Sequence, residues 1–262
     1  MNIRLALTLT PTQHASSLSR AGTLPPRVSR WLPAACASVL LAAASGGCGL
    51  FDQTITLQPQ EFKQNFGNSS GMVPSVTCTT AADPCAQVAN MVGGSIMGAT
   101  AKGVCDTSTQ KCTAEVSATL SYPITLSKEQ NFATNVAGKA VSIVHSITLK
   151  YGVSKNTTTF TIPETSLYIA PMGVTSVSDS RAVYIDKIPP IAKGTTIPDG
   201  GGSISLPEGS PARAEFVKYI QNPTTPFVLL GLAKPVVRAG DAMPAGEIWL
   251  RVIPEFVVGL PR

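Results

Sequence analysis

The amino-acid sequence predicts a mainly β protein: a β-sandwich-like body with one or two short helices and a disulfide-stapled excursion. Apolar and polar residues alternate with a period of two in several long segments, which is typical of strands with one buried face. The chain is rich in Thr, Ser, Val, Gly and Pro, and only 13% of its 262 residues are charged. This composition favours many short strands joined by sharp turns and does not resemble that of a disordered chain.

Alternation is clearest in three segments, which we expect to form the longest strands. In 141–151 the odd positions are mostly apolar and the even positions mostly polar, and 115–122 and 248–258 alternate in the same way. Segments rich in Gly and Pro, such as 199–202, predict turns between strands. Strands at this spacing without regular intervening helices favour a sandwich. The shorter strand candidates are 54–57, 160–162, 167–169, 183–185 and 227–232.

Few helices are expected. Ser210 followed by Pro211 is a helix start, with serine as the cap and proline in the first turn, and Asn222-Pro223 ends that helix. Two further candidates are a short helix over 128–136 and one that opens at 83–84 and is weakened or broken at Gly93-Gly94.

The N-terminal part of the chain carries a targeting pattern. The apolar run 31–44 is too short to span a membrane, which needs about 20 apolar residues, and Arg27 and Arg30 precede it. The small residues 45–47 and then Cys48 follow. This arrangement resembles the export and lipidation signal of bacterial lipoproteins. The resemblance implies removal of 1–47 and a palmitate-containing lipid on the Cys48 sulfur, which would tether the protein to a membrane.

An alternative is ordinary signal-peptide cleavage after Ala44, because Ala42 and Ala44 have the required A-x-A spacing. The cysteine count favours lipidation: Cys36 lies inside the signal, four later cysteines can pair, and Cys48 is the odd one. Gly49 follows Cys48 in place of the aspartate that retains many lipoproteins in the inner membrane. The resemblance therefore implies an outer-membrane location.

These patterns divide the chain into four parts. We expect a leader and signal peptide in 1–47, and a lipid anchor and tether with one strand in 48–75. A cysteine-containing excursion then occupies 76–113, and the β-sandwich-like domain fills 114–262.

The four cysteines that remain come as two C-x6-C pairs, and in an exported protein we expect two disulfides. A metal site is not expected, because zinc sites more often show C-x2-C pairs supported by histidine and no histidine lies within thirty residues. Three connectivities are formally open. The length of chain between the cysteines favours the two local pairs, Cys78 with Cys85 and Cys105 with Cys112. The residues concerned are Cys78, Cys85, Cys105 and Cys112.

The net charge argues against nucleic acid as a partner. Four of the 20 basic residues and none of the 15 acidic residues precede Cys48, so 16 basic residues remain beside 15 acidic ones. A nearly neutral mature chain lacks the basic surface that nucleic-acid binding requires.

No catalytic constellation is visible in the sequence. His145 is the single histidine after Cys48, the chain has no G-x-S-x-G elbow and no phosphate-binding loop, and its acidic residues are scattered. No cofactor is therefore expected. Trp249 is the single tryptophan after Cys48 and is a candidate binding surface.

We therefore expect a lipoprotein of the outer membrane that acts as a non-enzymatic binding or scaffolding component of the bacterial envelope. Its partners would be the membrane, through the N-terminal lipid, and an envelope protein or glycan. The alternative is an envelope hydrolase whose carboxylates meet only in the folded chain.

Overall fold

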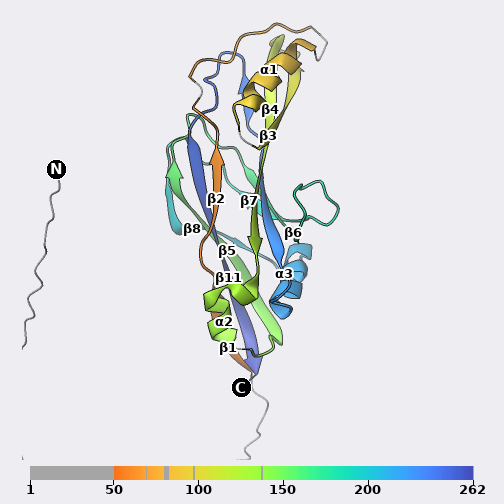
Figure 1. The fold of residues 1–262 in the computed structure, drawn as a ribbon, viewed down its shortest axis with the longest axis vertical. Coiled ribbons are helices and arrows are strands. Elements are labelled where there is room, and N and C mark those ends of the chain that lie inside the picture. Colours follow the sequence, from red (N-terminus) through yellow and green to blue (C-terminus); the bar gives the residue numbers. More distant parts are fainter. Residues whose placement is uncertain (1–49, 69, 80–82, 97, 137, 262) are drawn as a thin grey trace, which may run out of the picture. The chain divides into compact units, whose positions relative to one another are not determined.

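The computed structural model describes residues 50–261 except 69, 80–82, 97 and 137. The described residues form two antiparallel sheets with three α-helices (Figure 1), which confirms the predicted mainly β, sandwich-like fold. Among the described residues, no helix is both long and apolar enough to cross a membrane.

The first sheet is built around the long C-terminal strand. Its order is β1-β11-β5-β8, and β2 also pairs with β11. β1 and β2 lie one after the other along β11, separated by a break at Leu57–Pro59. The strands are β1 (Leu50–Thr56), β2 (Gln60–Asn65), β5 (Ile143–Asn156), β8 (Ile197–Ser205) and β11 (Glu247–Pro261).

The second sheet has the order β10-β4-β9-β6-β7, and β3 pairs with the first half of β4. A buried aliphatic and aromatic core fills the space between the two sheets. A smaller apolar cluster around Val174, Val228 and Leu230 forms apart from it. The strands are β3 (Ala99–Asp106), β4 (Lys111–Ile124), β6 (Thr165–Pro171), β7 (Val183–Ile188), β9 (Phe227–Ala233) and β10 (Val236–Arg238).

Helix α3 (Pro211–Gln221) connects the two sheets and forms where the sequence predicts it. The Ser210 hydroxyl accepts a hydrogen bond from the backbone N–H of Arg213 at 3.3 Å, as an N-cap should. Phe216 is fully buried and contacts Phe227 of the second sheet and Phe256 of the first. The helix therefore joins the two layers of the core.

The other two helices also match their predicted positions. α1 (Asp83–Gly94) ends at the Gly93-Gly94 pair, and α2 (Gln130–Val136) follows a 3-10 turn at Leu126–Lys128. Thr125 precedes that turn without making a side-chain capping hydrogen bond, and Ser127 lies inside it.

The structure differs from the expected division of the chain at two points. The segment 48–75 was expected to hold one strand, but β1 and β2 both pair with β11 and form part of the sheet. The boundary between 113 and 114 falls inside β4, which runs from the cysteine-containing excursion into the body without a break. The excursion is therefore an extension of the second sheet.

The glycine-rich segment 199–202 was predicted as a turn but lies inside β8. A Cβ at Gly202 would overlap the ring of Tyr151, and one at Gly152 would lie 2.8 Å from the carbonyl oxygen of Pro198. The glycines therefore allow β5 and β8 to approach closely at a shift in their register. The predicted strand 160–162 is also wrong, since it contributes only an isolated bridge between Ile162 and Ile191.

Candidate functional site

The predicted anchor Cys48 and the leader 1–47 lie outside the described residues. The chain that follows them is in regular structure from Leu50 onward, because β1 pairs with the last residues of β11. Helix α2 and Lys139, which follows it, also contact β1. The Asn131 side-chain amide donates to the carbonyl oxygen of Thr56 at 2.8 Å, and the Lys139 ammonium group lies 4.8 Å from the centre of the Phe51 ring.

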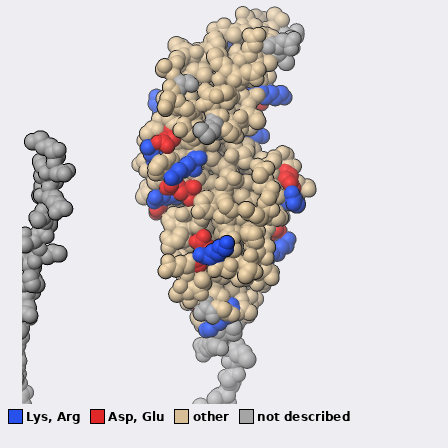
Figure 2. All heavy atoms as spheres, viewed as in Figure 1, with Lys and Arg blue, Asp and Glu red and all other residues tan. Residues whose placement is uncertain are grey.

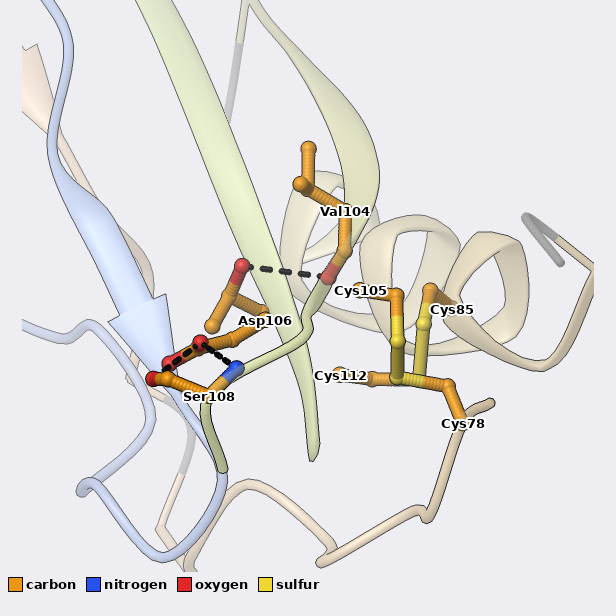
Figure 3. Close-up of a disulfide and its surroundings, with 8 residues drawn as sticks. Cys78, Cys85, Val104, Cys105, Asp106, Ser108 and Cys112 are labelled. Carbon is orange, nitrogen blue, oxygen red and sulfur yellow. Dashed lines mark hydrogen bonds between the residues drawn. A yellow bond between two sulfur atoms is a disulfide. The ribbon is translucent and has the colours of Figure 1, made fainter. Parts of the chain in front are cut away.

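The four predicted disulfide cysteines do form two disulfides, which confirms the pairing of all four. The expected connectivity is wrong: the bonds join Cys78 to Cys105 and Cys85 to Cys112. The two bonds lie side by side, as Figure 3 shows. The sulfur atoms of Cys78, Cys85 and Cys112 all lie within 4.8 Å of one another.

The crossed connectivity follows from the β3–β4 hairpin. Cys105 and Cys112 are opposite each other in this hairpin, so their side chains share one face of it. The segment before α1 runs along the start of β4, where the N–H of Cys112 donates to the carbonyl of Val76 at 2.9 Å. Helix α1 packs on β3 and β4, which brings Cys85 to the hairpin. Each hairpin cysteine therefore meets a partner from outside the hairpin.

The hairpin turn is closed by hydrogen bonds rather than by a disulfide. The Asp106 carboxylate accepts from the hydroxyl and the backbone N–H of Ser108, at 2.6 and 2.9 Å (Figure 3). These bonds hold the pKa of Asp106 at about 2. Gln110 adopts a positive φ of 54° in the same turn. Strand pairing between β3 and β4 holds the base of this turn.

Trp249 lies half-buried on the outward face of β11 and is not part of an apolar patch. Its indole N–H donates to the Glu247 carboxylate at 2.9 Å. The ammonium groups of Lys63 and Lys155 lie 4.3 and 5.0 Å from the ring centre. The indole therefore belongs to a charged surface network.

The carboxylates of this network are each matched by a cation. Arg251 bridges Glu61 and Asp199, with N–O distances of 3.1 Å to both. A hydrogen bond from Lys63 lowers the pKa of Glu61, and one from Lys155 lowers that of Glu247. Figure 2 shows such mixed groups of red and blue side chains on a largely uncharged face.

This electrostatic arrangement differs from that of a glycosidase. A general acid needs a raised pKa, whereas the pKa of both Glu61 and Glu247 is lowered. The ion pairs join residues up to 190 positions apart, so no local sequence signal could have revealed them. Among the described carboxyl groups, burial raises the pKa of Glu129, and a hydrogen bond from Gln60 opposes that effect.

His145 lies near the start of β5, where its Nε2 is 3.1 Å from a carboxylate oxygen of Asp52. The side chain of His145 is 42% exposed and that of Asp52 is 67% exposed. This pair links β5 to β1 at the end of the first sheet where the described chain begins. The geometry is that of a surface contact between strands.

Comparison of the chain with protein-family models, curated proteins and solved structures gave no significant match.

Proposed function

We propose that this chain is a bacterial envelope lipoprotein, anchored in the outer membrane through a lipid on Cys48. Its β domain would act as a non-enzymatic binding or scaffolding component. The observation that carries the proposal is that the chain is already paired with β11 at Leu50, only two residues after Cys48. Cleavage before Cys48 would leave every described strand intact and attach the lipid two residues before a paired strand.

The surface chemistry supports a binding role over a hydrolytic one. Glu61 and Glu247 are ion-paired, and hydrogen bonds from lysines lower their pKa values, whereas a general acid needs a raised one. Two disulfides fix the excursion at one end of the second sheet, so it presents a rigid surface. A rigid surface that binds without large reordering loses little conformational entropy.

In-cell crosslinking with mass spectrometry tests the binding role. We expect wild-type protein to be recovered crosslinked through lysines of the β domain to the same envelope protein in repeated experiments. Cys48→Ala, which would lack the anchor, should lose those crosslinks because it no longer resides at the membrane surface. Cys36→Ala is the matched control, since this cysteine lies in the segment that is removed.

Two results would contradict the proposal. One is an identical set of crosslinked proteins for wild type and Cys48→Ala, which would show that binding does not depend on the anchor. The other is turnover of an envelope glycan by the purified protein that is lost in both Glu61→Gln and Asp199→Asn. That second result would favour the hydrolase.

A further inference from the structure

An apolar groove of about 360 Å³ lies between α2, the segment that follows it and the C-terminal end of α3. Its walls include Phe132, Val136, Val141 and Ile220, all of which are buried. Lys139 also lines the groove. The volume falls in the range of small-molecule sites, which are mostly apolar with a few polar groups.

The groove lies next to the N-terminal part of β1, because Lys139 both lines the groove and contacts Phe51. Helix α2 and the residues after it run antiparallel to β1: Asn131 contacts Thr56, and Lys139 lies over Phe51. Phe51 therefore lies at the end of β1 that is next to Lys139 and residues 140–141, which line the groove. Cys48 precedes Phe51 by three residues and so lies within about 10 Å of it.

We propose that this groove holds one acyl chain of the lipid attached to Cys48. The inference rests on the proposed lipidation and adds a binding site for the lipid on the protein itself. Apolar walls suit a hydrocarbon chain, because each methylene removed from water favours binding. The ammonium group of Lys139 would lie near the polar ester end of the lipid. The groove would shelter the chain whenever the protein is away from a bilayer.

A photoactivatable fatty acid tests the site in the full-length protein. Cells are fed a palmitate analogue with a diazirine and an alkyne, the processed lipoprotein is purified in detergent and irradiated, and the crosslinked peptides are mapped by mass spectrometry. We expect crosslinks within 127–141 and 220–223. Ala133→Trp, which fills the groove from α2, should reduce their yield about tenfold at equal label. Thr134→Trp, at a neighbouring exposed position outside the groove, should leave the yield unchanged.

The outcomes separate the groove from the lipidation. A labelled protein without crosslinks in those two segments would overturn the groove and leave lipidation standing. Crosslinks that persist at full yield in Ala133→Trp would also overturn the groove and leave lipidation standing, because the acyl chain would then lie near the groove without filling it. A protein that takes up no label at all would overturn both proposals.

Discussion

Phe216→Ala should lower the free energy of unfolding by about 4 kcal/mol, as loss of a fully buried phenylalanine does. The side chain lies on α3 and contacts Phe227 in one sheet and Phe256 in the other, with ring centroids 5.8 and 6.3 Å away. Its removal would leave a cavity at the junction of both layers, and the surrounding rings cannot close it without moving two sheets. Guanidinium unfolding followed by circular dichroism measures the effect.

Lys218→Ala is the control on the same helix. Its side chain is 68% exposed and pairs with Glu215 on the surface, and such pairs contribute less than about 1 kcal/mol. Equal losses for Phe216→Ala and Lys218→Ala would contradict the role of α3 as the link between the sheets.

Gly103→Ala should cost about 3 kcal/mol, because overpacking against backbone cannot be relieved by a change of rotamer. A Cβ at this position of β3 would overlap the backbone of Cys85 in helix α1. The helix would have to move away from the hairpin, which also strains the Cys85–Cys112 bond. The guanidinium midpoint, measured without reductant, reports the loss.

Gly94→Ala provides the matched control at the end of α1. A Cβ there would meet nothing within 4 Å, so we expect no loss and a gain of up to about 1 kcal/mol from the stiffer unfolded chain. If Gly103→Ala unfolded at the wild-type midpoint, the close approach of α1 to β3 would be wrong.

The long strands and α3 could be predicted because their signals are local. In β11 the side chains of Ile248, Leu250 and Val252 are buried, as the alternation requires. The cap at Ser210 and the stop at Asn222-Pro223 set the bounds of α3 in the same way. The alternation of apolar residues and the capping signals each involve only a few neighbouring residues, and the tertiary structure did not override these local preferences.

Other features depend on which distant segments meet. The local disulfides were favoured on chain length alone, which ignores the face of the hairpin that α1 covers. The glycines of β8 were interpreted as a turn. They are needed instead because the ring of Tyr151 on the neighbouring strand, about fifty residues away in the sequence, leaves no room for a Cβ at Gly202. The ion-pair network around Trp249 and the apolar groove also join remote segments, and single-sequence patterns do not reveal such pairings.

The mass of the mature N-terminal peptide tests the proposed anchor most directly. Intact-protein and peptide mass spectrometry of protein purified from the membrane fraction, after growth with labelled palmitate, should show a chain that begins at Cys48. That residue should carry the mass of a diacylglyceryl group, and Cys48→Ala should take up no label. An unmodified chain that begins at Ser45, or equal labelling of wild type and Cys48→Ala, would contradict lipid anchoring at Cys48.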